Sequence, residues 1–311
     1  MTEICWDPHE VVELASWDEA LAKLLKCSTA HLLYRGQGDF AWPLSSSLAR
    51  SLTDQARAGG AIAPELYQSA VPRDERDRHV HDVETQLLRA FITEADSLGI
   101  PGLPSHDDRL AWWEMMQHHG VPTRLLDWTR SPFIALWFAI RDPHCAEGND
   151  AALWVFDSRT SWLNYAELIA NLEKENSGWA EFQDDRKWQN HLAEQAILKK
   201  SPAPLIVNPR VAVSRVVAQQ SVMTLTPYVG EPSAAHLQTI LATKVRIRAE
   251  WKPEIIRICE SFGLTQLNLF RDLDSLGKAL AAKLSNNVPL SPVSLALRDW
   301  FNHSQADKPQ S

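Results

Sequence analysis

The spacing of apolar and polar positions predicts several amphipathic helices. Residues 9–27 (HEVVELASWDEALAKLLKC) carry apolar side chains at helical intervals, and Ser16 with Glu19 three residues later has the pattern of a capping box. Residues 108–119 form a second helical run, and Gly120 fits the left-handed position that ends a helix. Further helices are predicted over residues 72–95 (with a solvated, mixed-charge start), 131–142, 160–200, 253–264 and 275–284.

Shorter apolar runs predict strands that are scattered among these helices. HLLYRG (residues 31–36) and AALWVFD (residues 151–157) predict buried strands, and ATKVRIRAEW (residues 242–251) predicts a half-exposed strand because apolar and polar residues alternate. LIVNPR and RVVAQQSVMTLTP predict a pair of strands, and residues 53–65 predict a loop. This order lacks the regular alternation of a doubly wound sheet, so it favours one α+β domain decorated by helices.

Composition and charge narrow the class of protein. The 311 residues carry a net charge of −8 with a pI of about 5.8, so the chain lacks the broad basic surface of a nucleic-acid coat protein. The N-terminus has no signal-peptide pattern, and the longest apolar run, FIALWFAI, is too short to cross a bilayer. Four widely spaced cysteines without a CxxC pair predict reduced thiols, and we expect a cytoplasmic protein without a membrane partner.

The first candidate for chemistry is Arg35 in YRGQGDF, at the end of the first predicted buried strand. Glycines after this arginine allow a ligand to approach the backbone, and a guanidinium group offers two parallel hydrogen bonds to a phosphate or carboxylate. The alternative is a structural ion pair with a buried carboxylate, for which Asp127 and Glu84 are the candidates.

The second candidate is QHHGVPTRLLDWT (residues 117–129), which mixes titratable and apolar residues. Adjacent histidines on a helix are poorly placed to face one metal ion, so no metal site is expected. Arg124 and Asp127 predict an ion pair that stiffens the segment, with a ligand-facing arginine as the alternative. Thr129 and Ser131 precede a helix N-terminus, which can bind an anion, although Ser131 is equally well explained as an N-cap.

The third candidate is SRVVAQQSVM, in which Arg215, Gln219 and Ser221 share one face if the segment is a regular strand. Polar residues on a strand beside a cleft can orient a ribose or an amide, whereas an exposed strand face needs no ligand. The sequence contains no GxGxxG, Walker A, GxSxG or HEXXH pattern, so spacing alone identifies no reaction.

Together these stretches resemble the FRG domain, a family named for its Phe/Tyr-Arg-Gly motif. The resemblance rests on HLLYRGQ, WPLSSSL, WWEMMQHHGVPTRLLDWTRSPFIALWFA, RVVAQQ and GLTQLNLFRDLDSLGKAL. It implies an FRG domain over residues 31–284, preceded by an N-terminal helical extension (residues 1–30) and followed by a C-terminal helix and disordered tail (residues 285–311).

The order of these motifs is also similar to that of the ADP-ribosyltransferase fold, which is a fold-level analogy. It implies a split, mixed β-sheet with a cleft for NAD as the substrate and without a metal ion. The catalytic residues implied by this resemblance are Arg35, His119, Asp127, Thr129, Ser131 and Gln219. The residues implied for nucleotide or NAD binding are Tyr34, Arg35, Gly36, Gln37, Arg124, Trp128 and Thr129.

The family resemblance further implies an intracellular effector linked to toxins or anti-phage defence, with a macromolecular acceptor and an antitoxin as a candidate protein partner. The segment around Gln219 carries no glutamate, whereas such transferases use a carboxylate to hold the ribose and stabilise an oxocarbenium-like transition state. Two interpretations follow. Either Asp127 or Glu84 supplies the carboxylate, or the domain is a non-catalytic nucleotide-binding sensor or adaptor.

Overall fold

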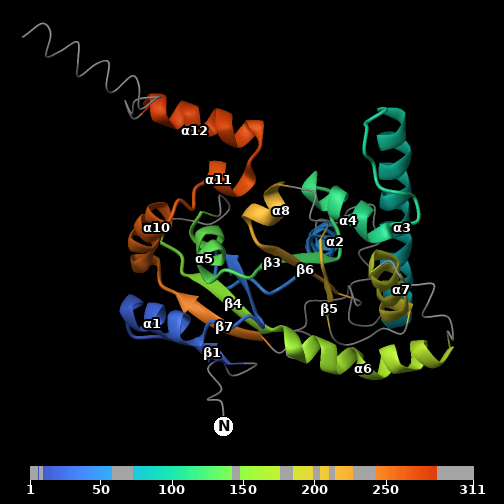
Figure 1. Ribbon diagram of the computed structural model, residues 1–311, viewed down its shortest axis with the longest axis horizontal. Helices are drawn as coiled ribbons and strands as arrows, with labels where there is room; N and C mark the ends of the chain where they lie inside the picture. Colours follow the sequence, from blue (N-terminus) through green and yellow to red (C-terminus); the bar gives the residue numbers. More distant parts are fainter. Residues whose placement is uncertain are drawn as a thin grey trace, which may run out of the picture.

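The computed structural model describes residue 6 and residues 10–57, 73–141, 148–175, 185–198, 204–209, 214–226 and 242–285. They contain a seven-stranded sheet in the order β1-β7-β4-β2-β3-β6-β5 (Figure 1). Its strands are β1 (Val11–Val12), β2 (Leu32–Gln37), β3 (Leu125–Thr129), β4 (Ala151–Asp157), β5 (Leu205–Val207), β6 (Ser221–Leu225) and β7 (Ala242–Ile247). β1 and β7 are parallel and the other neighbours antiparallel. This confirms the prediction of a single α+β domain with a mixed sheet.

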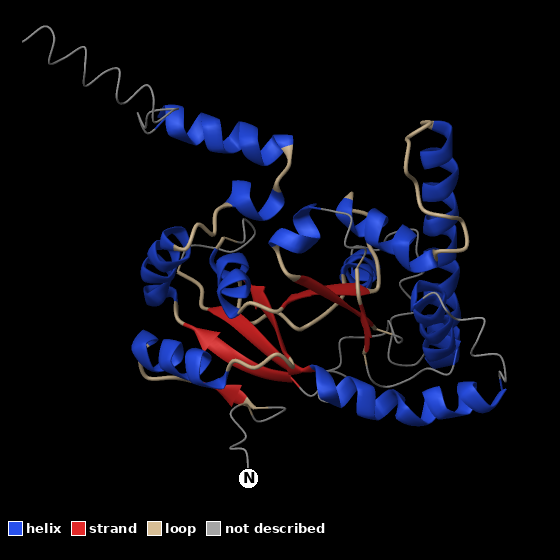
Figure 2. Ribbon diagram, in the orientation of Figure 1, coloured by secondary structure: helices blue, strands red, loops and turns tan. Residues whose placement is uncertain are grey.

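Helices surround the sheet (Figure 2). They are α1 (Trp17–Cys27), α2 (Ser47–Arg57), α3 (Arg73–Ser97), α4 (Arg109–His118), α5 (Pro132–Ile140), α6 (Ser158–Glu175), α7 (Asp185–Leu198), α8 (Ser214–Ala218), the 3-10 turn η3 (Ala249–Trp251), α10 (Lys252–Ser261), α11 (Gln266–Phe270) and α12 (Leu273–Ser285). One core cluster joins α1, α5 and α10 to β2, β4 and β7, and another joins α3, α4, α6 and α7 to β3, β5 and β6. Each half of the sheet therefore has its own apolar core with these helices, while a third cluster joins residues of β2, β3, β4, β6 and β7.

The local signals that predicted helix ends are confirmed. The Ser16 hydroxyl accepts a hydrogen bond from the Glu19 amide (3.2 Å) at the start of α1. Gly120 has a left-handed backbone (φ 82°) just after α4. The Ser131 hydroxyl caps α5 by accepting from the amide of Ile134 (3.4 Å). Side-chain acceptors satisfy free helix N–H groups in both caps, as their spacing predicted.

The centre of the sheet is weakly joined. β2 and β3 share a single register pair, Tyr34 with Thr129, whereas β2 pairs with β4 and β3 with β6 along their whole lengths. The two central strands therefore diverge. Across the gap, Arg35 Nη1 donates a hydrogen bond to the main-chain oxygen of Asp127 (2.7 Å). This divergence leaves room for a cleft between the two halves.

Gly36 allows α5 to pack directly on β2. A Cβ atom at this position would lie 1.9 Å from the carbonyl oxygen of Ala135 and 2.6 Å from the amide nitrogen of Ala139. Both atoms belong to the helix backbone, so a rotamer change cannot relieve the collision. The glycine that follows Arg35 thus determines how closely α5 approaches the divergent strand.

Arg124 pairs with Glu84 of α3, so the predicted pair with Asp127 is wrong. The two side chains are both 3% exposed and meet through two hydrogen bonds, Nη2 to Oε2 (2.6 Å) and Nε to Oε1 (2.7 Å). Arg124 also donates to the main-chain oxygen of Thr226 (3.3 Å). Residues three apart on extended chain point to opposite faces, so Arg124 and Asp127 cannot readily meet.

Four segments differ from their predictions. Residues 249–251 form the 3-10 turn η3 instead of continuing β7, which ends at Ile247. Val11 and Val12 form an edge strand paired with β7 instead of extending α1, because their main-chain groups complete the sheet. Residues 53–57 continue α2, since Asp, Gln, Ala and Arg precede the glycines there; the rest of the predicted loop lies outside the described residues. Residues 214–218 form α8 instead of a strand, and β6 starts only at Ser221.

The cysteines also differ from their prediction. Cys27 is disulfide-bonded, so the prediction of reduced thiols is wrong for this residue. Cys259 is a free thiol, and burial raises its pKa to about 11. The predicted disordered tail lies outside the described residues. None of the described helices is long and apolar enough to cross a membrane.

Candidate functional site

A cleft of about 1330 Å³ lies between the two halves of the sheet. Its walls come from β2, α5 and α11 on one side and from α4, β3, α8 and β6 on the other. In Figure 1, α4, α8 and α11 lie above β3 and β6, and α5 lies beside these strands, toward β4. The predicted site residues that line this cleft are Tyr34, Arg35, Gly36, His119, Asp127, Trp128, Thr129 and Gln219.

The other predicted site residues do not line the cleft. Gln37 accepts a hydrogen bond from the indole of Trp154 and donates to the main-chain oxygen of Pro43 (3.2 Å). Arg124 is held in its buried pair, and the Ser131 hydroxyl caps α5. Each of these side chains has a structural partner, so its part in the site is to position the elements that carry other residues.

Arg35 and Asp127 lie at the point where β2 and β3 diverge. Arg35 binds the Asp127 main-chain oxygen, which leaves the Asp127 carboxylate to accept from Gln117 Nε2 (2.6 Å) instead. Asp127 is exposed and Arg35 is partly buried. The cleft therefore holds a cation and a carboxylate that do not form an ion pair with each other in the structure.

Thr129 connects β3 to the segment between α8 and β6. Its hydroxyl donates to the main-chain oxygen of Gln219 (2.7 Å) and accepts from the amide of Ser131 (3.1 Å). Gln220 follows with φ 47°, a left-handed conformation that is strained in a residue other than glycine. These contacts hold Arg35, Thr129 and Gln219 at one cleft although they are far apart in the sequence.

Arg215 and His118 also line the cleft, although the residues implied by the family resemblance did not include them. Arg215 Nη1 lies 3.4 Å from His118 Nδ1, and its guanidinium carbon lies 4.4 Å from the centre of the Phe270 ring. Burial lowers the pKa of His118, and the positive charges of Arg215 and His119 lower it further, against an opposing effect of Asp272. The sequence indicated Arg215 through its place in the RVVAQQ motif, but the strand predicted there gave its side chain no defined partner.

The part of the cleft wall that contacts Arg215 is aromatic. The Phe270 ring centre lies 6.0 Å from that of Phe138 and 6.1 Å from that of Trp137, and the latter two rings stack edge to face at 5.2 Å. Aromatic faces of this kind can pack against a planar heterocycle, and Arg215 already covers one face of Phe270.

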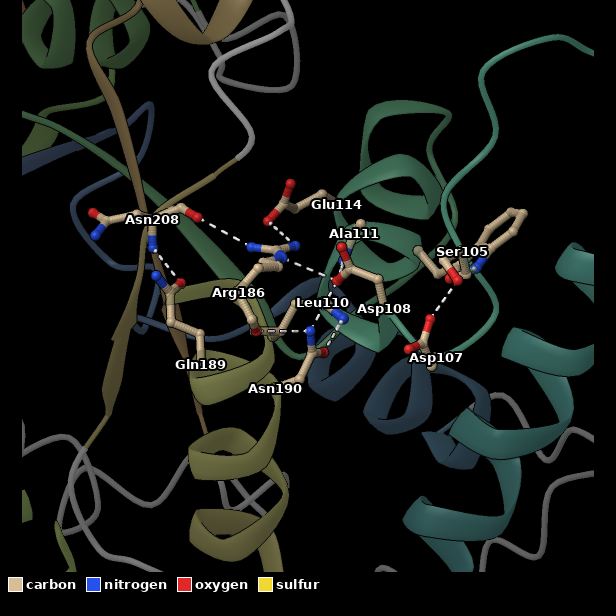
Figure 3. A network of polar contacts seen from close by, with 11 residues as sticks. Ser105, Asp107, Asp108, Leu110, Ala111, Glu114, Arg186, Gln189, Asn190 and Asn208 are labelled. Atoms are coloured by element: carbon tan, nitrogen blue, oxygen red, sulfur yellow. Dashed lines mark hydrogen bonds and ion pairs between the residues drawn. The ribbon is translucent and has the colours of Figure 1, made fainter. Parts of the chain in front are cut away.

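Two further carboxylates that line the cleft, those of Glu114 and Glu260, are held in ion pairs. Figure 3 shows Arg186 of α7 bound to Asp108 (Nε to Oδ1, 2.9 Å) and to Glu114 (Nη2 to Oε1, 2.8 Å), with Asn190 also on Asp108. On the other side, Arg141 pairs with Glu260 (2.6 Å). The negative charges of Glu114 and Glu260 are therefore balanced by arginines. The carboxylate of Asp127, by contrast, is bound by the neutral side-chain amide of Gln117.

The polar groups of the cleft suit an anionic, partly aromatic ligand better than a metal ion. Within the described ranges, no three His, Cys, Asp or Glu side chains are grouped so that they could hold a metal. Guanidinium groups, a hydroxyl, an amide and stacked rings are the groups that recognise phosphates, sugars and bases.

Comparison with known proteins gives a family but no near relative. The family model of the FRG domain matches residues 30–147. No match was found among curated proteins or among solved structures. The matched segment contains β2, β3, α4 and α5, and it ends before β4, so α8, β6 and α11 complete the cleft from outside it. The chain therefore carries an FRG domain, which supplies Arg35, Asp127 and Thr129 to the cleft.

Proposed function

We propose that the cleft binds NAD and that the protein is an ADP-ribosyltransferase-like enzyme. The observation that carries the proposal is the convergence of Arg35, Thr129 and Gln219 on one cleft at the divergence of β2 and β3. A separate placement of these residues would have removed the basis for the analogy. The cleft is also large enough for a dinucleotide, since pockets for drug-sized ligands measure roughly 300–1,000 Å³.

The proposed reaction breaks the bond between the nicotinamide nitrogen and C1′ of its ribose. Nicotinamide leaves with the bonding electron pair, and a nucleophile of the acceptor forms the new bond to C1′ and loses its proton. Asp127 is the proposed carboxylate, which stabilises positive charge on the ribose and accepts that proton. Arg35 binds a phosphate, the side-chain oxygen of Gln219 accepts a hydrogen bond from a ribose hydroxyl, and Thr129 fixes the Gln219 backbone. His119 has a supporting role in this scheme.

The test measures nicotinamide release and label transfer from NAD labelled in the adenylate to protein, RNA and DNA. We expect Asp127→Asn to lower turnover by roughly 100-fold to 1,000-fold, the usual effect of removing one preorganised charge-stabilising group. Glu250→Gln removes an exposed carboxylate outside the cleft and is the matched control. Absence of both release and transfer by the wild-type protein would sink the enzyme proposal.

The second candidate function is a nucleotide-binding sensor or adaptor without turnover. The segment from α8 to the start of β6 favours it, because its polar residues Gln219, Gln220 and Ser221 include no carboxylate. Calorimetry separates the two functions. Heat on titration with NAD, without nicotinamide release, identifies the binding module.

The proposed cellular role is that of an effector in toxin or anti-phage systems, with an antitoxin as the candidate partner. This role rests on the family resemblance alone. The test is growth of cells that express the wild-type protein or Arg35→Ala at equal levels. Equal growth of the two strains would argue against a toxic activity that needs this cleft.

A further inference from the structure

We propose that Arg215 and Gln219 form an oxyanion subsite in the cleft, which takes a phosphate group of a nucleoside diphosphate. The proposal deepens the proposed function and rests on it for the place of the ligand. It assigns a new role to the α8 segment, which lies outside the part of the chain that the family model matches.

The first observation is that Arg215 is partly buried and lacks a carboxylate partner. In the described ranges its contacts are the His118 ring nitrogen and the Phe270 face, and no ion pair is formed. Asp127 and Asp272 act on it only from a distance, and burial lowers the pKa of its guanidinium. A charge that is withdrawn from water normally has a counter-ion, because desolvation is costly.

Two other arginines, one buried and one partly buried, differ from Arg215 in this respect. Arg124 meets Glu84 through two hydrogen bonds, and Arg186 binds both Asp108 and Glu114. The fold thus supplies carboxylates to the guanidinium groups that it uses to join helices and strands. Arg215 lines the cleft instead, so an anion that enters the cleft can supply the missing charge.

The second observation is an unused hydrogen-bond donor on the same segment. Gln219 is 9% exposed and lines the cleft, and its Nε2 atom has no hydrogen-bond partner among the described residues. An unpaired buried donor costs about 1–3 kcal/mol, and a ligand acceptor removes that cost. Gln219 follows Arg215 by four residues, and the main-chain amide of Gln219 donates to the main-chain oxygen of Arg215 (2.9 Å).

The chemistry of these groups points to a phosphate. A guanidinium with an amide donor beside it matches the several oxygens of a phosphate, and Phe270 offers an apolar surface to an adjoining ring. Arg35 lines the same cleft from β2. Of the three arginines that line the cleft within the described residues, Arg141 is paired with Glu260. Arg35 and Arg215 suit the two charges of a diphosphate, with Arg215 binding the phosphate that Arg35 does not.

The test is calorimetric titration with inorganic pyrophosphate, ADP and adenosine. We expect Arg215→Gln to weaken pyrophosphate and ADP binding by roughly 10-fold to 100-fold, the range for a lost charged hydrogen bond, and to leave adenosine binding unchanged. Arg257→Gln is the matched control, because it removes an exposed charge on α10 outside the cleft, and it should bind like the wild type. Thermal unfolding checks that each variant is folded.

A second variant keeps the test decisive if Arg215→Gln does not fold. Gln219→Glu preserves the shape of the side chain but places a carboxylate beside Arg215, so it should weaken pyrophosphate binding by at least about 10-fold. Equal affinities of wild type and both variants, or no pyrophosphate binding by the wild type, would overturn the subsite.

The outcome is separable from that of the proposed function. If pyrophosphate binding depends on Arg215 but NAD is not consumed, the subsite stands and the transferase is wrong. If NAD is consumed equally by the wild type and Arg215→Gln, the transferase stands and the subsite is wrong.

Discussion

Gly36→Ala tests whether the close packing of α5 on β2 stabilises the fold. The added Cβ would lie 1.9 Å from the Ala135 carbonyl oxygen and 2.9 Å from the Ala139 Cβ. Ordinary contacts begin near 3.5 Å, so β2 and α5 must separate by about 1 Å or more. Overpacked cores lose about 1–3 kcal/mol, and a collision with rigid helix backbone belongs at the upper end of this range. We therefore expect the free energy of unfolding to fall by about 3 kcal/mol.

The measurement is guanidinium chloride unfolding of the wild type, Gly36→Ala and Gly277→Ala, followed by far-UV circular dichroism. Gly277 lies in α12, and a Cβ there meets no atom within 4 Å. This control should be stabilised by about 0.5–1 kcal/mol, because alanine favours a helix over glycine. An unfolding midpoint of Gly36→Ala at or above that of the wild type would refute the packing argument.

Three further changes test the pairs described above. Glu84→Gln should cost about 3–5 kcal/mol in chemical unfolding, because it leaves Arg124 charged and buried. Thr129→Val should cost about 1–3 kcal/mol in the same assay, since it removes a donor and an acceptor from a buried junction. ADP-ribose affinity, measured calorimetrically between about pH 8 and pH 5, should rise as the pH falls, because the bound anion favours the protonated His118 ring. The rise should level off below the lowered pKa of His118. In His118→Gln, which keeps Arg215 but has no titrating ring, this pH dependence should disappear.

The sequence predicted the parts of the fold that depend on local chemistry. The caps at Ser16 and Ser131 and the helix stop at Gly120 use contacts within four residues, so their spacing alone reveals them. The segment 214–220 was mistaken for a strand because its pattern fits both periods over so short a run. Its helix ends at Ala218, and no sequence rule favours the left-handed backbone of Gln220 two residues later.

The partners of charged residues could not be predicted in this way. Arg124 has Asp127 three residues away, yet it pairs with Glu84, forty positions earlier in the chain. Arg215 meets His118 and Phe270, which belong to other segments. Spacing reports which side chains share a face of one element, but it does not report which elements meet.

The two motifs that carry the family resemblance divide into residues that build the cleft and residues that face it. In YRG, Gly36 sets the distance of α5 while Arg35 reaches across the divergent strands. In TRLLDWT, Arg124 forms a buried ion pair with Glu84, while Asp127 and Thr129 line the cleft. Each motif therefore places a polar group beside a structural residue that fixes its element. A substitution of Gly36 or Arg124 should change stability and ligand affinity together, and so should one of Thr129, whose hydroxyl also holds the Gln219 backbone. A substitution of the exposed Asp127 should change affinity alone.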